Sequence, residues 1–151
     1  MNANKILFPS DFSHTSDAAL EMATALARDA GATLVIVHVE EHTTAYGGGE
    51  FYYGIAEPAT ADLGRMLEEI TPTDPQVPYQ HRLISGEPAS AIARLAEAED
   101  VDMIVMGTHG RTGLSRFVMG SVAESVVRRA KCPVLTYKQP AAQDEMLSES
   151  R

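Results

Sequence analysis

The stretch VDMIVMGTHGRTGLSRFVMGS, residues 101–121, decides which fold we expect for this chain. Residues 101–106 are an apolar run typical of a buried strand, whereas residues 122–129 have the spacing of a helix. The loop between them holds four glycines, and loops of this length in a compact domain are usually functional or disordered. Glycine lets backbone N–H groups approach a ligand, and a helix N-terminus adds unpaired donors. The loop therefore predicts an anion site, most often a phosphate site.

Working outward from this loop, strand-like and helix-like segments alternate along the chain. Strands are expected at residues 6–8, 33–39, 77–84, 101–106 and 134–137. Helices are expected between Ser13 and Gly31, over 61–70, from about Pro88 to Ala96, and over 122–129. This alternation of five strands with four helices predicts an α/β fold, a single doubly wound parallel sheet with helices on both faces.

Single residues predict where the first and last helices begin, end and pack. Ser13 or Ser16 is expected to cap the first helix, and Gly31 to end it in a left-handed conformation. Thr24 falls away from the apolar stripe of this helix. That stripe is expected to contain Ala19, Met22, Leu26 and Ala30. The buried side of the last helix is expected to contain Val126, Val127 and Ala130.

Composition limits the class of protein. A length of 151 residues suits one domain, for which we expect bounds of 1–138, followed by an acidic flexible tail over 139–151. The formal net charge of −9 argues against nucleic acid as a partner. No apolar run approaches the roughly 20 residues that span a bilayer. Because residues 1–5 lead straight into the first expected strand, we expect no signal peptide, and the one cysteine, Cys132, fits a reducing cytosol.

Strand order indicates where a ligand would bind. In open parallel sheets, ligands bind at the carboxyl ends of the strands, where the winding direction reverses. If the strand at 6–8 lies beside that at 101–106, Pro9, Ser10 and Asp11 meet Met106 and Gly107 at this point, next to Val39. A purine is then expected against the Val39 and Met106 side chains, with Asp11 accepting hydrogen bonds from the ribose or the base.

The phosphates of such a ligand would reach the loop from Gly110 to Ser121. Ser121 supplies a hydroxyl at the start of the helix, and Arg111 supplies charge that neutralises phosphate. Better-known nucleotide motifs are absent. The chain has no G-x-x-x-x-G-K-[ST] motif, its first strand–helix turn has no glycine, and the second histidine of HIGH-type nucleotidyltransferases is missing.

Less specific interpretations of the same residues stay open at this point. The glycines also suit simple turns, Asp11 suits a cap of the first helix, and Arg111 suits a solvated loop side chain. Cys132 is expected to be a small packing residue, and the histidines show no metal-ligand spacing. The tyrosine- and glycine-rich segment 44–54 either covers a ligand or another subunit, or is disordered. We assign no catalytic residue and no metal ligand.

With these residues in view, the chain resembles the universal stress proteins of the ATP-binding class. That class carries the pattern G-x2-G-x9-G-[ST], which Gly107, Gly110, Gly120 and Ser121 match without a gap. The resemblance covers almost the whole domain, through KILFPSD at 5–11, VHV at 37–39, MGTHG at 106–110 and KCPVL at 131–135. The segment 44–54 and the acidic tail depart from the family pattern.

The resemblance implies a strand order of 3-2-1-4-5 and ATP as the ligand, with any Mg²⁺ held mainly by the phosphates and water. It also implies a homodimer joined through the last strand, Val134–Tyr137, with higher oligomers open. An apolar edge strand independently favours such pairing. Residue matching implies these nucleotide contacts: Pro9, Ser10, Asp11, Val39, Met106, Gly107, His109, Gly110, Arg111, Gly120, Ser121 and Val122.

For function, the resemblance implies a cytoplasmic stress or regulatory protein whose nucleotide state modulates its dimer or a partner protein, such as an enzyme or a transporter. A slow ATPase or another phosphoryl-transfer enzyme is the alternative. Hydrolysis needs an in-line nucleophile, and the sequence identifies none. A third interpretation is an assembly module that has lost ligand binding.

Overall fold

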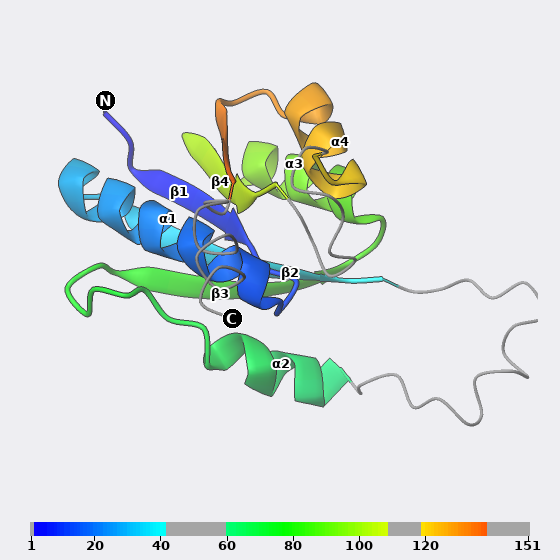
Figure 1. Cartoon of the computed structure of the whole chain (residues 1–151), viewed down its shortest axis with the longest axis horizontal. Helices are drawn as coiled ribbons and strands as arrows, with labels where there is room; N and C mark the ends of the chain where they lie inside the picture. Colours follow the sequence, from blue (N-terminus) through cyan, green and yellow to red (C-terminus); the bar gives the residue numbers. More distant parts are fainter. Residues whose placement is uncertain (1, 42–59, 109–118, 139–151) are drawn as a thin grey trace, which may run out of the picture.

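The computed structural model contains a five-stranded parallel sheet with helices on both faces (Figure 1). It describes residues 2–41, 60–108 and 119–138. The strands are β1 (Lys5–Pro9), β2 (Thr33–Glu40), β3 (Tyr79–Ser85), β4 (Met103–Gly107) and β5 (Val134–Tyr137). The helices are η1 (His14–Ser16), a single 3₁₀ turn, and α1 (Asp17–Ala30), α2 (Thr60–Glu68), α3 (Pro88–Ala98) and α4 (Ser121–Arg129). The order β3-β2-β1-β4-β5 confirms the predicted fold class and strand order.

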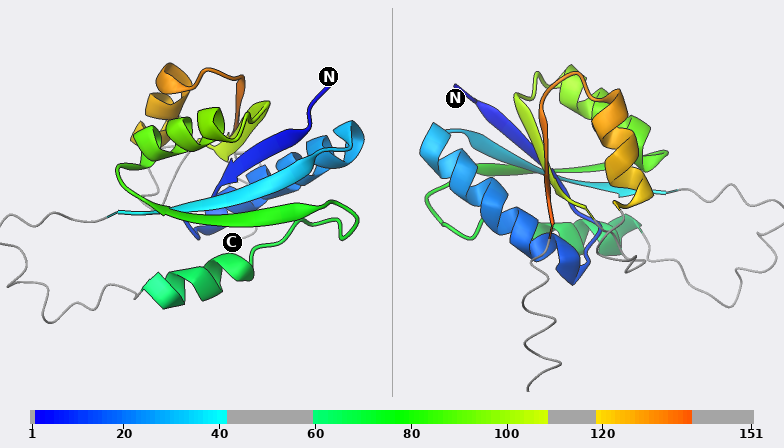
Figure 2. Two further views of the ribbon diagram at one scale, coloured as in Figure 1. Left: turned by 180° about the vertical axis from the view of Figure 1, so that it is seen from behind. Right: turned by 45° about the horizontal axis from the view of Figure 1, so that its top comes forward.

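The central strands divide their side chains between two apolar layers. In β1, Ile6 and Phe8 pack with α1 and α2, whereas Leu7 packs with α3 and α4, and each is at most 1% exposed. The same alternation places Leu34 and Val35 of β2 in opposite layers. Figure 2 shows the two pairs of helices on opposite faces of the sheet. Burial on both faces explains why these strands read as continuous apolar runs.

One residue of α1 contradicts the predicted pattern. Thr24, expected away from the core, is only 1% exposed. Its hydroxyl donates to the Leu20 carbonyl at 2.8 Å and accepts from the Thr73 N–H at 3.2 Å. The buried hydroxyl is therefore satisfied, and it fixes the segment after α2 against α1. Gly31 ends α1 with a φ of 68°, as predicted.

Two other expectations about the helices are corrected. Ser16 stands at the N-cap position of α1, but its hydroxyl donates to the Ser13 carbonyl at 2.7 Å and caps no helix N–H. Val127 of α4, expected to be buried, is 45% exposed, whereas Val126 is completely buried. Neighbouring residues on a helix point about 100° apart, so only one of these two valines faces the sheet. No helix within the described residues is long and apolar enough to cross a membrane.

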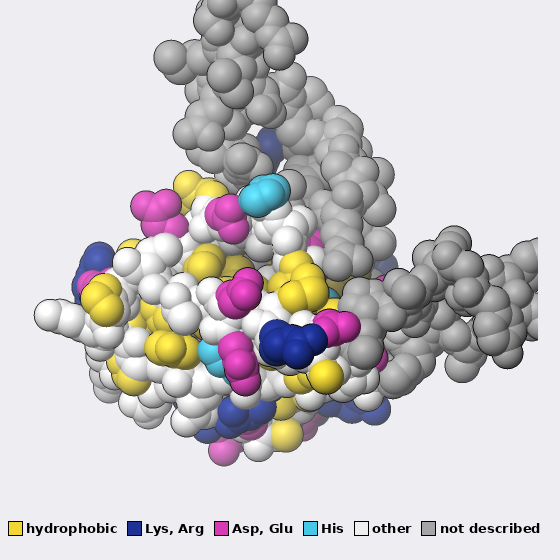
Figure 3. All heavy atoms as spheres, turned by 90° about the horizontal axis from the view of Figure 1, so that it is seen from below, with side chains coloured by type: hydrophobic (Ala, Val, Ile, Leu, Met, Phe, Trp, Pro, Cys, Tyr) yellow, Lys and Arg dark blue, Asp and Glu magenta, His cyan; other side chains and the backbone are white. Residues whose placement is uncertain are grey.

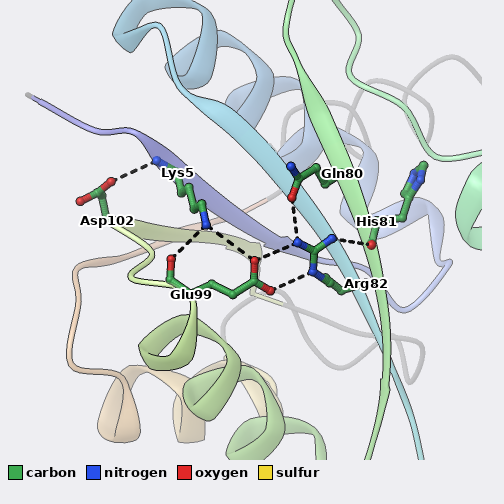
Figure 4. A network of polar contacts seen from close by, with 6 residues as sticks. All are labelled: Lys5, Gln80, His81, Arg82, Glu99 and Asp102. Carbon is green, nitrogen blue, oxygen red and sulfur yellow. Dashed lines mark hydrogen bonds and ion pairs between the residues drawn. The ribbon is translucent and has the colours of Figure 1, made fainter.

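A polar network ties β3 and the start of β1 to the end of α3 (Figure 4). Arg82 donates to both carboxylate oxygens of Glu99, at 2.9 and 3.0 Å, and Lys5 Nζ donates to the Glu99 carbonyl at 3.3 Å. The Asp102 carboxylate accepts from the backbone N–H groups of Asn4, at 2.7 Å, and Lys5, at 3.0 Å. These two N–H groups lower the pKa of Asp102.

The lowered pKa of Asp102 predicts how stability depends on pH. A carboxyl group whose pKa is lower in the folded state stabilises that state above its unfolded value, here near 3.8, and loses this contribution as the pH falls through the folded value. We expect Asp102→Asn to lower the free energy of unfolding at neutral pH. The difference from the unmodified protein should shrink below pH 3.8. Urea unfolding across a pH series measures it, and a difference that is constant with pH would contradict the assignment.

Candidate functional site

The carboxyl ends of β1, β2 and β4 lie side by side, as expected for a ligand site at the point where the winding reverses. β1 pairs with β2 from Lys5↔Thr33 to Pro9↔Val37, and it pairs with β4 through Ile6↔Met103 and Leu7↔Ile104. The chain winds from β1 through β2 to β3 in one direction, and β4 and β5 lie on the other side of β1. The arrangement places Pro9, Val39 and Gly107 at one edge of the sheet.

The connection from β1 to α1 is fixed by β2. The Ser10 N–H donates to the Val37 carbonyl at 2.8 Å, and His38 Nδ1 lies 2.7 Å from the Ser10 carbonyl oxygen. Because a carbonyl oxygen only accepts, Nδ1 carries the proton in this contact. The His38 side chain is 9% exposed, so this contact is buried. Both backbone polar groups of Ser10 are thus bonded to β2.

Phe12 is the strained residue of this connection. Its φ of 66° lies in the left-handed region, which costs a residue other than glycine on the order of 1–3 kcal/mol. The Phe12 ring lies 4.1 Å from the His38 ring, and its N–H donates to the Ser10 hydroxyl at 3.1 Å. The sequence analysis missed the roles of Phe12 and His38. No feature of the sequence indicates a positive φ at a phenylalanine, and the sequence pattern around His38 indicates only a strand.

Asp11 is held in a tight turn. One of its carboxylate oxygens accepts from the Ser13 N–H at 2.9 Å and from the Ser13 hydroxyl. This contact spans two residues, as in turns that an aspartate side chain closes on its own backbone. The N-cap position of α1 belongs to Ser16, so the interpretation of Asp11 as the cap of that helix is wrong. The carboxylate is held at the end of β1.

The two ends of the glycine pattern are joined at the end of β4. The Gly120 N–H donates to the Thr108 carbonyl at 2.6 Å, and the Thr108 N–H donates to the Tyr137 carbonyl at 3.1 Å. Gly120 is the N-cap residue of α4, which begins at Ser121 as the sequence predicted. The first N–H groups of a helix have no acceptor within it and carry partial positive charge. The N-terminus of α4 therefore lies beside the end of β4.

Predicted contact residues on the described strands divide between the two faces. Val39 and Met106 pack in the apolar layer with α3 and α4. Ser10 lines a cavity on the opposite face, together with Phe8. Val122 is 38% exposed on the first turn of α4.

Other residues that the sequence singled out have no place in this description of the site. His109, Gly110 and Arg111 lie outside the described residues, as does the segment 44–54. Cys132 is half-buried, and this burial raises the pKa of its thiol. A raised pKa keeps the thiol protonated and unreactive, in line with the expected packing role.

Comparisons with known proteins agree with this fold. Universal stress protein MJ0531 of Methanocaldococcus jannaschii is 34% identical over 145 residues, which cover 90% of this chain and 82% of that protein. The solved structure of MJ0577 from the same organism superposes with a TM-score of 0.72 at 30% identity, covering 93% of this chain and 99% of that one.

A more distant structure shares the fold. The universal stress protein from Archaeoglobus fulgidus, solved in complex with dAMP, has a TM-score of 0.60 at 24% identity, covering 90% of this chain and 98% of that one. A model of the universal stress protein family matches residues 2–138. On the strength of this match, the chain belongs to the universal stress protein family.

Proposed function

We propose that this protein binds an adenine nucleotide, ATP, at the carboxyl ends of β1, β2 and β4. The observation that carries the proposal is the Gly120 N–H bond to the Thr108 carbonyl, at 2.6 Å. This bond holds the N-terminus of α4 beside the strand ends, where its donors suit phosphate. Family membership supports the proposal, and the Archaeoglobus fulgidus protein with the same fold is an example that holds an adenine nucleotide, dAMP.

Each part of the nucleotide has a proposed position. The base packs against Val39 and Met106, and the Asp11 carboxylate accepts hydrogen bonds from the ribose or the base. The phosphates bind beside Gly120, at the N–H groups of Ser121 and Val122 and the Ser121 hydroxyl. The matched glycine pattern adds these proposed contacts: Pro9, Ser10, Gly107, His109, Gly110 and Arg111. Mg²⁺, when present, is held mainly by the phosphates and water.

We propose a regulatory role for nucleotide binding, in the cytoplasm. The proposed site combines the phosphate-binding N-terminus of α4 with one carboxylate, Asp11, which Ser13 fixes in its turn. Cys132, the one thiol of the chain, is kept protonated by burial. Binding of ATP would change the shape of a dimer or its affinity for a partner protein, such as an enzyme or a transporter.

A charge placed at the start of α4 tests the phosphate position. We expect Ser121→Glu to weaken ATP binding at least about tenfold, because a carboxylate there repels phosphate. The same carboxylate favours the helix, since negative charge near a helix N-terminus is stabilising, so the fold is retained. Isothermal titration calorimetry with ATP and with adenosine measures the effect, which should be large for ATP and small for adenosine.

A matched variant separates this local effect from net charge. Val127→Glu adds the same charge to the exposed side of α4, further along the helix, and should leave ATP affinity within about twofold. Equal losses in both variants, or equal losses of ATP and adenosine in Ser121→Glu, would contradict the proposed phosphate position. Failure of the unmodified protein to bind ATP below millimolar concentration would overturn the proposed function itself.

The last strand supports the proposed homodimer. The Ile104 N–H donates to the Pro133 carbonyl at 3.0 Å, and the Thr108 N–H to that of Tyr137 at 3.1 Å. Because successive residues of a strand alternate, Val134 and Thr136 point their backbone polar groups away from β4. β5 is the last strand in the sheet order, and Leu135 is 36% exposed on it. A second copy of the chain would satisfy these groups by strand pairing.

A proline at this edge tests the dimer. Thr136→Pro removes an N–H that points away from β4, so it leaves the β4–β5 hydrogen bonds in place. We expect this variant to be mainly monomeric in analytical ultracentrifugation. Thr136→Val keeps the N–H and the branched side chain, and should remain dimeric. Dimers of equal stability in both variants would place the interface elsewhere.

A further inference from the structure

A cavity of about 390 Å³ lies on the face of the sheet opposite to α4. It opens between the end of β1, the start of α1 and the end of α2 with the residues that follow it. Figure 3 views the molecule from the side of α2, where hydrophobic side chains lie between acidic ones. Small-molecule sites commonly have volumes of about 300–1,000 Å³. The cavity is therefore large enough for a small ligand and lies on the other side of the sheet from Val39 and Met106.

The inner wall of the cavity is apolar and preformed. Phe8, at 1% exposed, and Leu20 contribute from β1 and α1, and Ile70 contributes from the segment after α2. Phe12 lines the same wall, and the His38 ring 4.1 Å away holds its ring in place. An apolar body of a ligand would thus meet a surface that needs little reorganisation.

Among the described residues, the ionisable side chains that line the cavity carry charge of one sign. The ionisable side chains that line it are Asp17 and Glu69, both carboxylates. His14 lies 3.5 Å from Asp17, but both side chains are exposed to solvent, so this pair is weak. On α2, Arg65 is paired with Asp62. The C-terminus of α2 adds partial negative charge, and the carboxylate of Asp17 outweighs the partial positive charge at the start of α1.

Two of the serine hydroxyl groups on the wall donate their hydrogens to other groups of the chain. The Ser16 hydroxyl donates its hydrogen to the Ser13 carbonyl at 2.7 Å, and the Ser13 hydroxyl donates to Asp11. A hydroxyl that donates its single hydrogen elsewhere offers only lone pairs. Together with the carboxylates of Asp17 and Glu69, these two hydroxyls suit a ligand that donates hydrogen bonds and carries positive charge.

We propose that this cavity binds a small amphipathic ammonium compound. Its apolar body packs against Phe8, Phe12 and Leu20, and its ammonium group faces the carboxylates of Asp17 and Glu69. The apolar wall and the carboxylates come from three different elements, so the site depends on the folded chain. This second site does not depend on nucleotide binding at the N-terminus of α4.

Three probes of matched shape and different charge test the proposal. Phenethylammonium, phenethyl alcohol and hydrocinnamate are titrated into isotopically labelled protein, and backbone amide signals are followed by NMR. We expect phenethylammonium to shift the amides of Ser16, Leu20 and Ile70 saturably. Phenethyl alcohol has no charge, so it should bind more weakly than phenethylammonium, by roughly two- to fivefold for each carboxylate contact that is lost. Hydrocinnamate carries negative charge and should bind most weakly.

Charge-neutral variants give the matched controls. Asp17→Asn and Glu69→Gln should each weaken phenethylammonium binding roughly two- to fivefold. Glu21→Gln and Glu68→Gln remove the same charge from α1 and α2 at residues that do not line the cavity. These two variants should leave the affinity for phenethylammonium unchanged. Equal binding of the three probes, equal effects of all four variants, or no saturable shift at these amides would overturn the proposal. Because Ser121→Glu should not affect these titrations, failure of the nucleotide site and failure of this site are distinguishable.

Discussion

The pairing of β1 with β2 on one side and with β4 on the other is the constraint from which the other elements take their positions. Ile6, Leu7 and Phe8 are buried on both faces of the sheet, so helices have to cover both. Right-handed crossovers then require the chain to wind in opposite directions on the two sides of β1. The reversal brings the ends of β1, β2 and β4 together. The proposed nucleotide site is a consequence of this one placement.

Much of this fold could be predicted because the signals are local. The apolar run at 33–39 is long and β-branched, and Gly31 ends α1 as its sequence position suggests. The burial of Thr24 was not predicted, because it depends on a contact that is not local. The hydroxyl of Thr24 is satisfied in part by Thr73, which is 49 residues away, and such a partner cannot be read from helical spacing. The prediction that both Val126 and Val127 of α4 are buried was wrong, because helical spacing alone does not say which of the two valines faces the sheet.

Some features of the candidate site could likewise be predicted from the sequence, and others could not. The sequence places Ser121 at the start of the last helix, and the bond from Gly120 to Thr108 helps to fix that start, since it joins two residues 12 apart in sequence. The bond between Asp11 and Ser13 inside the turn after β1 and the contact of His38 with the Ser10 carbonyl were not predicted. They depend on the left-handed backbone of Phe12 and on the distance of the Ser10 carbonyl from β2. Only the folded chain brings these groups together.

The residues from Ser10 to Ser13 belong to both faces of the molecule. The Asp11 carboxylate lies at the carboxyl edge of the sheet, whereas Ser10, Phe12 and Ser13 line the cavity beside α1 and α2. His38 fixes this segment from β2 through the Ser10 carbonyl and the Phe12 ring. A ligand on either face changes the other only if it binds one arrangement of this segment better than another. The Phe12 ring and the His38 contact are described groups that hold this segment in one arrangement.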